Sequence, residues 1–361
     1  MPIAVAVSGG TDSLMALVLL REAGHTVLAA HARFLPRRDD GRPDDSDRAA
    51  EGLAALCARL DLPFFDLDLR AEFEAAVIAP FVAAFASGLT PNPCSQCNPR
   101  LKFGVLAGRA RELGASRLAT GHYARLEVSP EGDVRLFPAA DHSRDQSYFL
   151  ALVPPRDLAC SVFPLAGRIK SRLAAELASR HLAPPLPGES REVCFIPGDD
   201  YRAFLLSRGA ALSGPGPILL SDGREVGRHR GLWRHTVGQR RGLGVAWSEP
   251  LYVLARDAAR NALVVGPRAE LGATRCQAKD VNFLADPTTW PERLLVQACY
   301  RQRPVPARVA VVPDPGGETL DVAFASPVPR PAPGQTLVVR DDQGMVLAGA
   351  VLDEGGHGLL A

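Results

Sequence analysis

The chain has 361 residues, and its 41 lysines and arginines against 40 aspartates and glutamates give a formal net charge of +1. At roughly 100–200 residues per domain, this length predicts two or three domains. A net charge so close to zero argues against a histone-like or wholly basic nucleic-acid binder, but it says nothing about local basic patches. Hydrophobic residues make up 47% and charged residues 22%, which is typical of soluble globular proteins.

Neither a membrane span nor a secretory signal is predicted. No apolar run reaches the roughly 20 residues that cross a bilayer. Residues 1–7 are apolar but lack basic residues and run into a glycine-rich turn, so they indicate a strand rather than a signal peptide. The seven cysteines are odd in number and scattered, unlike a secreted disulfide framework. We expect a cytoplasmic protein with no membrane partner.

Strand and helix patterns alternate through the first 125 residues. Strand patterns cover residues 3–7, 26–30, 63–67 and 117–120. Helical periodicity covers residues 12–22, 49–60, 73–85 and 100–113. This order predicts a parallel sheet with helices on both faces.

The pattern changes in the second half of the chain. A helix is predicted at residues 165–180, and short alternating runs dominate from residue 214 onward. Gly, Pro, Asn and Asp separate these runs, which is typical of antiparallel barrels or sandwiches. The runs cover residues 251–254, 262–265, 294–298, 308–312, 320–324 and 336–339.

A glycine-rich loop, Ser8-Gly9-Gly10-Thr11-Asp12-Ser13, joins the first predicted strand to the first helix. Glycines let a ligand approach the backbone, and a helix N-terminus offers unpaired N–H donors to an anion. The two serines add hydroxyls, and Asp12 is available to help place a metal. The loop is neither a Walker A motif nor GxGxxG, and a Gly-Gly turn after a strand is often only a turn. It resembles the PP-loop of ATP pyrophosphatases, which cleave ATP to AMP and pyrophosphate while adenylating a substrate.

Residues 90–104, with the sequence TPNPCSQCNPRLKFG, are the most informative stretch. Two X-Pro bonds predict a rigid extended turn, followed by a helix with Asn98 as its N-cap and Pro99 at its first position. Cys97 would then stand at a helix N-terminus near Arg100 and Lys102, and both effects favour its thiolate. The alternatives are a small buried side chain or a zinc ligand, but a four-cysteine zinc site needs a second close pair, which the sequence lacks.

The other cysteines carry weaker signals. Cys194, on its own, has the pattern of a buried strand residue. The remaining four have no supporting context, and we expect them to be packing residues; they are Cys57, Cys160, Cys276 and Cys299.

Taken together, these features closely resemble the bacterial tRNA-specific 2-thiouridylases, which place sulfur on C2 of the wobble uridine. The resemblance is nearly full-length. Its motifs lie at residues 8–13, 90–104, 120–125, 145–150, 193–197 and 227–244. The resemblance implies an α/β fold with a doubly wound parallel-sheet PP-loop domain (residues 1–152), a small central domain that contacts tRNA and carries the second catalytic cysteine (153–212), and an antiparallel β-barrel domain (213–361).

The resemblance also implies roles for residues. Cys97 matches the nucleophile and Cys194 the persulfide carrier, and the two would form a transient disulfide. The implied ATP-binding residues are Ala6, Val7, Ser8, Gly9, Gly10, Thr11, Asp12, Ser13, Ala32, Arg33 and Gly121. The implied contacts with the target base are Asn92, Pro93 and Cys94, and those with tRNA are Arg144, Asp145, Gln146, Tyr300 and Arg301.

The implied reaction adenylates the uridine C2 oxygen with ATP and Mg²⁺, so that AMP can leave when a persulfide attacks C2. The loop and the metal would stabilise the charge on the transferring phosphoryl group. The implied partners are tRNAs for Glu, Gln and Lys and a persulfide donor, such as a cysteine desulfurase or a sulfur relay protein. A cellular reductant would then reset the catalytic disulfide.

Three alternatives stay open. Cys94, Cys97 and Cys194 could ligate three irons of a [4Fe–4S] cluster and leave the fourth iron for sulfide. The chain could instead be another PP-loop enzyme, such as an amide or nucleotide synthetase, which does not need the two cysteines. It could also be a tRNA-binding protein without catalytic activity.

A basic stretch gives an independent indication of RNA binding. Between residues 221 and 241, six arginines stand against Asp222 and Glu225, for a local charge of +4. The arginines are Arg224, Arg228, Arg230, Arg234, Arg240 and Arg241, with His229, Trp233 and His235 interleaved. Arginine on phosphate together with aromatic stacking suits RNA, and the alternative is a solvated basic loop. A second basic stretch contains Arg301, Arg303 and Arg308.

Four positions depart from the family pattern. Arg144 and Pro187 stand where lysine is usual, His235 replaces a tyrosine, and Cys299 replaces an arginine beside Tyr300. The change at Arg144 keeps the charge but alters its geometry. None of the four removes a group that the implied chemistry needs.

Overall fold

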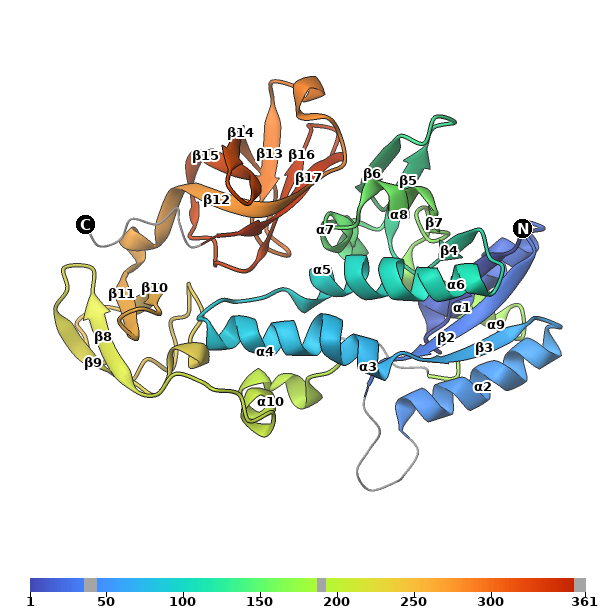
Figure 1. Ribbon diagram of the computed structural model, residues 1–361, viewed down its shortest axis with the longest axis horizontal. Coiled ribbons are helices and arrows are strands. Elements are labelled where there is room, and N and C mark those ends of the chain that lie inside the picture. Colours follow the sequence, from blue (N-terminus) through green and yellow to red (C-terminus); the bar gives the residue numbers. More distant parts are fainter. Residues whose placement is uncertain (36–43, 187–192, 354–361) are drawn as a thin grey trace. The chain divides into compact units, whose positions relative to one another are not determined.

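The computed structural model describes residues 1–35, 44–186 and 193–353, and the chain divides into two compact units (Figure 1). The first unit comprises Met1–Ile78, Cys94–Phe195 and Gly344–Val346. The second unit comprises Ala79–Pro93, Ile196–Gln343 and the residues from Leu347 onward. No helix among the described residues is long and apolar enough to cross a membrane.

A parallel five-stranded sheet organises the first unit, as the alternating pattern predicted. Its strand order is β3-β2-β1-β4-β7, and the central strand pairs Val5 with Ala29 on one side and with Ala119 on the other. The strands are β1 (Ile3–Ala6), β2 (Val27–Arg33), β3 (Phe64–Asp68), β4 (Arg117–Ala119) and β7 (Ser161–Val162). The β1 strand and the first four residues of β2 are apolar because both of their faces are covered.

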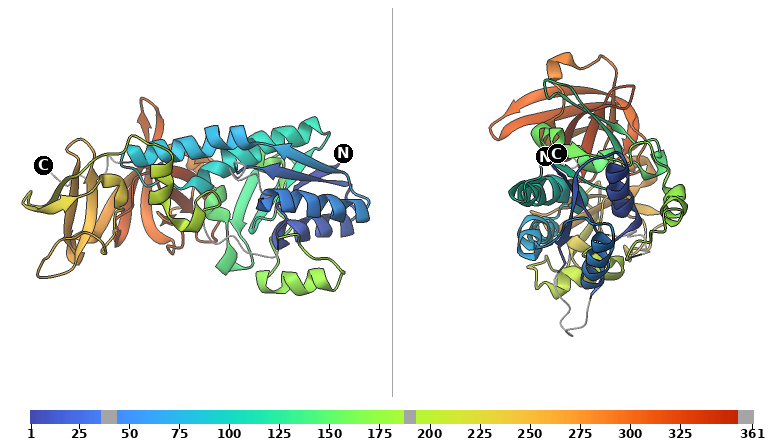
Figure 2. Two further views of the ribbon diagram at one scale, coloured as in Figure 1. Left: turned by 90° about the horizontal axis from the view of Figure 1, so that it is seen from below. Right: turned by 90° about the vertical axis from the view of Figure 1, so that its right-hand side faces the viewer.

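Helices cover both faces of this sheet (Figure 2). On one side, α1 (Thr11–Glu22), α2 (Asp45–Arg59) and α9 (Lys170–Ala178) share an apolar cluster with β1 that includes Leu17, Leu53 and Leu173. On the other side runs a continuous helix made of α5 (Pro93–Cys97), η2 (Asn98–Leu106) and α6 (Ala107–Glu112). The doubly wound fold class is therefore confirmed.

Local capping explains where several helices begin. The α2 helix starts at Asp45, four residues before its predicted start, because Asp44 and Asp47 form a capping box in which each carboxylate accepts the other's backbone N–H. The predicted start of α9 at residue 165 was wrong. The helix begins at Lys170, whose backbone N–H donates to the Asp141 carboxylate at 2.9 Å.

The start predicted for the cysteine-bearing helix was also wrong. This helix begins at Pro93, where the missing N–H costs nothing, and not at Pro99. Pro99 lies inside it, and the helix winds there as a π-helix from Asn98 to Leu106. Proline removes an i→i−4 hydrogen bond, and the wider i→i+5 turn accommodates that loss.

The remaining elements of the first unit connect the layers. A hairpin that the sequence patterns did not predict is formed by β5 (Ala124–Val128) and β6 (Val134–Pro138) and turns at Gly132. The others are α3 (Arg70–Phe73), η1 (Glu74–Ile78), η3 (His142–Arg144), α7 (Ser147–Leu150) and α8 (Pro155–Ala159).

Two β-structures make up most of the second unit. A four-stranded sheet has the order β10-β11-β8-β9, with β11 and β8 parallel. A six-stranded antiparallel barrel has the order β12-β15-β14-β13-β16-β17 and is closed by pairing of β12 with β17. The predicted barrel is therefore confirmed.

The helices and strands of the second unit have the following bounds. The helices are α4 (Ala79–Ala86), η4 (Pro197–Asp199), α10 (Tyr201–Ser207), η5 (Leu232–Arg234), η6 (Arg268–Leu271) and η7 (Pro287–Thr289). The sheet strands are β8 (Gly216–Leu220), β9 (Glu225–His229), β10 (Leu251–Asp257) and β11 (Ala262–Pro267). The barrel strands are β12 (Gly272–Phe283), β13 (Leu294–Gln297), β14 (Val305–Asp314), β15 (Gly317–Pro329), β16 (Thr336–Arg340) and β17 (Val346–Leu352).

Candidate active site

The glycine-rich loop lies at the carboxyl end of β1 and is held by its own serines. The Ser8 backbone N–H donates to Ser13 Oγ at 3.0 Å, and Ser13 Oγ donates to the Gly10 carbonyl at 3.1 Å. Gly9 has φ +87°, the left-handed region that favours glycine. The loop is therefore a fixed turn that leads into the N-terminus of α1, as a phosphate cradle requires.

Gly121, an implied ATP-binding residue, lies against this helix N-terminus. A Cβ placed on Gly121 would be 2.9 Å from the carbonyl carbon of Asp12 and 3.0 Å from the backbone nitrogen of Ser13. No side chain fits there without a shift of the backbone. Residues 121 and 8–13 are thus brought together, although more than 100 positions separate them in sequence.

Asp12 is held by two partners that sequence reasoning missed. Lys170 Nζ donates to Asp12 Oδ1 at 2.7 Å, and the Tyr123 hydroxyl donates to the same oxygen at 2.8 Å. Burial and the Asp12 carboxylate raise the pKa of Tyr123, so this phenol stays protonated. Lys170 places a cation beside the loop. It is one of only three lysines in the chain, but arginine outnumbers lysine so heavily throughout the sequence that this scarcity did not single it out.

The second ATP-contact segment, Ala32 and Arg33, lies at the carboxyl end of β2. Arg33 donates from Nε to Asp66 at 2.9 Å and pairs with Asp47 at the start of α2. These carboxylates raise the pKa of Arg33. The buried His31 contacts the Val7 carbonyl at 2.8 Å and so ties β2 to the residue before the loop.

Lys102 is the cation that the cysteine-bearing helix directs toward Cys97. A π-helix closes each turn between residues i and i+5, so Lys102 stands one turn above Cys97. In an α-helix the neighbours would be residues 100 and 101, at i+3 and i+4. Arg100, which the sequence placed beside the thiol, is exposed instead.

His122 holds Lys102 in place. The Lys102 ammonium donates to His122 Nε2 at 3.4 Å, and His122 Nδ1 lies 2.6 Å from Thr120 Oγ1. Burial and the neighbouring ammonium lower the pKa of His122 well below 6.5, so the ring is neutral. A neutral ring that accepts at Nε2 carries its proton on Nδ1 and donates it to Thr120.

The three cysteines of the two predicted catalytic motifs lie close enough for their charges to interact. Burial raises the pKa of Cys97, Lys102 lowers it, and Cys94 raises it further. Burial, and then the Cys97 and Cys94 thiols, raise the pKa of Cys194 to about 12. Burial also raises the pKa of Cys94, and Lys102 opposes this effect. The structure therefore brings Cys94, Cys97 and Cys194 together around one lysine.

Two sequence expectations about these thiols were wrong. Cys97 was expected at a helix N-terminus with a favoured thiolate, but it lies at the end of α5, only 9% exposed, and burial outweighs the effect of Lys102 on its pKa. Cys194 was given a buried strand pattern, but it is exposed and lies in a turn. Protein atoms nevertheless surround it closely enough to disfavour its thiolate.

The cysteines without motifs divide into two pairs. Cys57 and Cys276 are buried, as predicted for packing residues. Cys160 and Cys299 are exposed, so that prediction was wrong for them. Among the residues described here, no group of three or more Cys, His, Asp or Glu side chains is arranged to hold a metal ion.

The predicted base and tRNA contacts differ in accessibility. Asn92 is buried, and Pro93 begins α5. Arg144 is exposed, whereas Asp145 accepts the backbone N–H of Ala139 at 3.1 Å and Gln146 accepts that of Tyr123 at 3.0 Å. The side chains of Asp145 and Gln146 therefore shape their own loop.

The pair Tyr300 and Arg301 is exposed, and the Arg301 guanidinium lies 5.4 Å from the Tyr300 ring centroid. Cys299, the departure beside this pair, points its thiol at the Tyr300 carbonyl at 3.5 Å. Pro187, another departure, lies outside the described residues. The contacts of these residues with tRNA stay a prediction.

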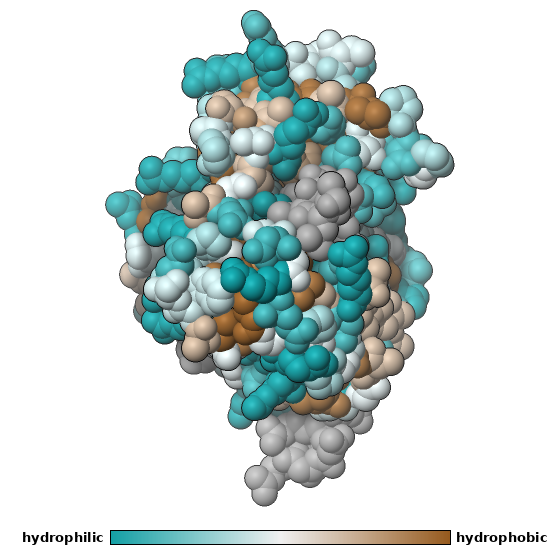
Figure 3. All heavy atoms as spheres, turned by 90° about the vertical axis from the view of Figure 1, so that its left-hand side faces the viewer, coloured by the Kyte–Doolittle hydropathy of each residue, from teal (hydrophilic) through white to brown (hydrophobic). Residues whose placement is uncertain are grey.

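The basic stretch is arranged differently from the expectation. Five of its six arginines are exposed: Arg224, Arg228, Arg230, Arg240 and Arg241. The interleaved aromatics, expected to stack on RNA, are buried instead; they are His229, Trp233 and His235. Seen from the side of β8 and β9, hydrophilic side chains cover most of the surface, with smaller apolar areas between them (Figure 3).

Comparisons with known proteins agree with this arrangement. Family models match three consecutive stretches. They are described as the tRNA methyl transferase HUP domain (residues 1–198), the tRNA methyl transferase PRC-barrel domain (202–267) and the aminomethyltransferase beta-barrel domain (273–352).

Full-length relatives share a single description. The tRNA-specific 2-thiouridylase MnmA of Nitratidesulfovibrio vulgaris strain Miyazaki F is 52% identical over 352 residues, covering 98% of this chain and 99% of that protein. Proteins of the same description from Oleidesulfovibrio alaskensis and Lawsonia intracellularis are 51% and 44% identical over 355 residues, with the same coverage of both chains. Identity of this size over nearly every residue of both partners places the chain in the family of tRNA-specific 2-thiouridylases.

Proposed function

We propose that this protein is an ATP-dependent tRNA sulfurtransferase that forms 2-thiouridine at the wobble position. The observation that carries the proposal is the gathering of Cys94, Cys97 and Cys194 around Lys102 in the unit that also holds the glycine-rich loop. The shared description of the relatives supports the same substrate and product.

The first step activates the base. The C2 oxygen of uridine attacks the α-phosphorus of ATP, the bond to the β-phosphate oxygen breaks, and pyrophosphate leaves as the N3 proton is lost. The residues proposed to hold the nucleotide are the loop, Gly121 and the backbone at Ala32 and Arg33. Lys170 adds a cation beside the loop. Mg²⁺, when bound with the nucleotide, supplies further neutralisation of phosphate charge.

The second step transfers sulfur. The outer sulfur of a Cys194 persulfide attacks C2, and the C2–O bond breaks to release AMP. The Cys97 thiolate then attacks the Cys194 sulfur, and the electron pair of the broken S–S bond stays on the sulfur bound to C2. The product is 2-thiouridine, and the two cysteines are left as a disulfide that a cellular thiol or dithiol must reduce.

The proposed partners follow from this chemistry. The acceptors are tRNAs for Glu, Gln and Lys, and the persulfide comes from a cysteine desulfurase or a sulfur relay protein. A [4Fe–4S] cluster on Cys94, Cys97 and Cys194 is the rival route. The proposed route uses the thiols alone, and the cluster route is one outcome of the test below.

The test is sulfur transfer from radiolabelled cysteine to unmodified tRNA with ATP and a cysteine desulfurase. We expect Cys97→Ser and Cys194→Ser each to abolish transfer, because each removes a sulfur that forms or breaks a bond. Cys160→Ser, at an exposed cysteine of the first unit, is the matched control and should keep full activity.

Retained transfer in either catalytic variant contradicts the persulfide route. A brown anaerobic preparation absorbing near 400 nm, with activity lost in Cys94→Ser, favours the cluster route over it. ATP–pyrophosphate exchange that needs no tRNA favours another PP-loop activity. Binding of tRNA without ATP turnover contradicts the enzyme assignment altogether.

A further inference from the structure

One exposed tryptophan lies beside the basic stretch, just outside the range that the sequence indicated. Trp247 is 40% exposed, whereas Trp233 is 4% exposed and donates its indole N–H to the Ser213 carbonyl at 3.2 Å. The Arg224 guanidinium carbon lies 5.1 Å from the centre of the Trp247 ring. An accessible aromatic face next to arginine is therefore present in the second unit, supplied by Trp247 and not by the three buried rings.

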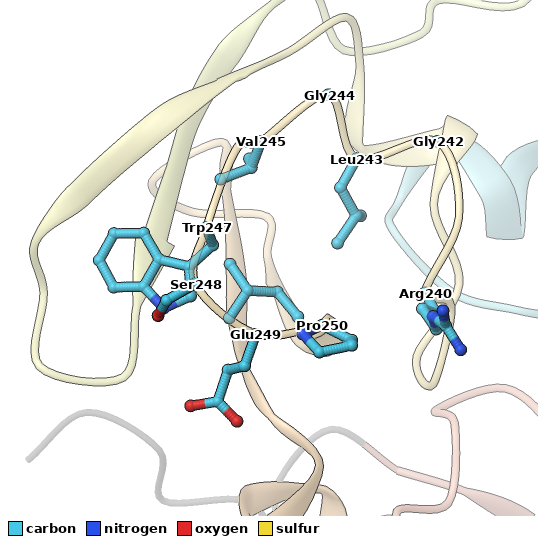
Figure 4. Close-up of a pocket in the computed structure, with 10 residues that line it drawn as sticks. Arg240, Gly242, Leu243, Gly244, Val245, Trp247, Ser248, Glu249 and Pro250 are labelled. Carbon is cyan, nitrogen blue, oxygen red and sulfur yellow. The ribbon is translucent and has the colours of Figure 1, made fainter.

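Trp247 forms one wall of a cavity of about 410 Å³ in the segment before β10 (Figure 4). Leu243, Val245 and Pro250 supply apolar surface, Arg240 lies on the side opposite Trp247, and Glu249 adds a carboxylate at the edge. A volume of this size falls in the range of small-ligand sites. It suits one nucleotide, with its base against the ring and its phosphate beside the arginines.

The cavity is already formed without a ligand. The Gly238 backbone N–H donates to the Val253 carbonyl at 2.8 Å, and the Val253 N–H donates to the Gln239 carbonyl at 2.9 Å. These bonds fasten the residues before Arg240 to β10. Leu243 is buried in an apolar cluster with Leu251. The side of the cavity near residues 238–243 is thus positioned by hydrogen bonds and packing, which reduces the ordering needed there on binding.

Charge identifies the occupant. Arg240 lines the cavity and Arg224 contacts the Trp247 ring, and both arginines are exposed. Among the residues that line the cavity, Glu249 is the acidic one. A polyanion that also offers a flat ring meets both features, and single-stranded nucleic acid is such a ligand.

We propose that this cavity binds one unpaired nucleotide of the tRNA substrate, stacked on Trp247 with its phosphate at Arg240. The inference rests on the proposed function only in taking tRNA as the partner. It adds a site in the second unit that none of the contacts implied by the family resemblance includes. The site contributes affinity and does not take part in the chemistry.

The test compares Trp247→Phe with Trp247→Leu. Phenylalanine keeps a ring that can stack, whereas leucine keeps only apolar area. We expect Trp247→Leu to raise the dissociation constant for tRNA about tenfold, because the stacking of one base is lost. In Trp247→Phe the dissociation constant should stay within about twofold of the wild-type value, because the ring can still stack. Melting temperatures check that both variants fold.

A charge pair completes the experiment. Arg240→Gln should weaken tRNA binding and lower the slope of log affinity against log salt by about one, since one phosphate contact is lost. Arg293→Gln, at an exposed arginine elsewhere in the second unit, is the matched control and should change neither value. Sulfur transfer at limiting tRNA should fall in Trp247→Leu and Arg240→Gln in proportion to the lost affinity, whereas Arg293→Gln should keep the wild-type rate.

The outcomes separate the two proposals. If Trp247→Leu binds tRNA as the wild type does, the nucleotide site is wrong and the proposed function stands. If Trp247→Leu instead weakens binding of the persulfide donor and leaves tRNA binding intact, the cavity is a protein-docking surface and the inference is overturned. If the wild-type protein neither binds nor thiolates tRNA, the proposed function itself fails.

Discussion

The cysteine site of the first unit and the arginine-rich surface of the second unit place charge in opposite surroundings. Around Cys97 a single ammonium, Lys102, acts among thiols that burial keeps protonated. On the surface near Trp247, several guanidinium groups lie in water, and their ion pairs are long, as between Arg224 and Asp222 at 3.7 Å. One region has little charge in a poorly hydrated setting, and the other has much charge in a well-hydrated one.

This difference determines how each region can act. Charges in a desolvated site interact strongly and depend little on salt, so removing one charge changes reactivity by orders of magnitude. Exposed charges are screened, so each contributes little and the effect of salt is large. We therefore expect large kinetic effects from single changes in the first unit and small, salt-dependent affinity effects from single changes in the second.

The largest effect in this comparison is expected at Lys102. Lys102→Met removes the cation that opposes the effect of burial on the thiols, and we expect single-turnover sulfur transfer to fall about 100-fold. ATP–pyrophosphate exchange with tRNA should stay near the wild-type rate, because the nucleotide loop is untouched. Lys279→Met is the matched control at an exposed lysine and should leave both rates unchanged.

Two further variants separate charge from structure. Lys102→Arg keeps the charge but does not match the single acceptor at His122 Nε2, so we expect partial activity. His122→Phe removes that acceptor while Lys102 stays, so we expect an intermediate loss. Equal activity in Lys102→Arg and Lys102→Met would contradict the role of the charge.

How much of the fold and of the site the sequence predicts depends on how far apart in the chain the interacting residues are. The loop after β1, the parallel sheet and the later barrel follow from local patterns of apolar residues and glycines. The burial of Trp233 and His235 depends on packing around η5 and β9, which a stretch of arginines does not reveal. Lys170 and Asp12 are 158 residues apart, and no local pattern joins them.

The helix around Cys97 shows a different limit. Two X-Pro bonds indicated an extended turn before residue 98, but Pro93 begins the helix and Pro99 is accommodated by a π-helical turn. That change of winding moves Lys102, rather than Arg100, next to Cys97. A sequence rule that assumes α-helical spacing selects the wrong cation here, because i+5 is not a neighbouring position in an α-helix.

An intermediate effect is expected when the pH is lowered, because protonation of His235 reduces the folding stability of the second unit. Burial, followed by nearby histidine and arginine charges, lowers the pKa of His235 to about 4 from its ordinary value of 6.5. The unfolded chain binds this proton more readily, so the folded state loses stability as the pH falls below about 6.5 and loses most of that contribution by about 4. At pH 5 the loss amounts to about 2 kcal/mol.

Denaturant unfolding of the wild type and His235→Phe at pH 7.5 and pH 5 measures this effect. The phenylalanine variant should lose about 2 kcal/mol less between the two pH values, whatever its stability at pH 7.5. An equal loss in both proteins would mean that His235 is not the group responsible. His25→Phe, at an exposed histidine, provides the control.

The smallest effect concerns thiols that are exposed yet surrounded by protein. Cys194 is solvent-accessible, but its pKa is raised to about 12, so only a small fraction is thiolate at pH 7. Because the thiolate is the reactive form, alkylation of Cys194 by iodoacetamide should speed up about tenfold per pH unit between pH 7 and 9 without a plateau. The measurement uses the wild-type protein, in which Cys94 and Cys97 are present, and mass spectrometry of the Cys194 peptide. A plateau below pH 8 would contradict the raised pKa, and it would mean that the first unit activates Cys194 before any substrate binds.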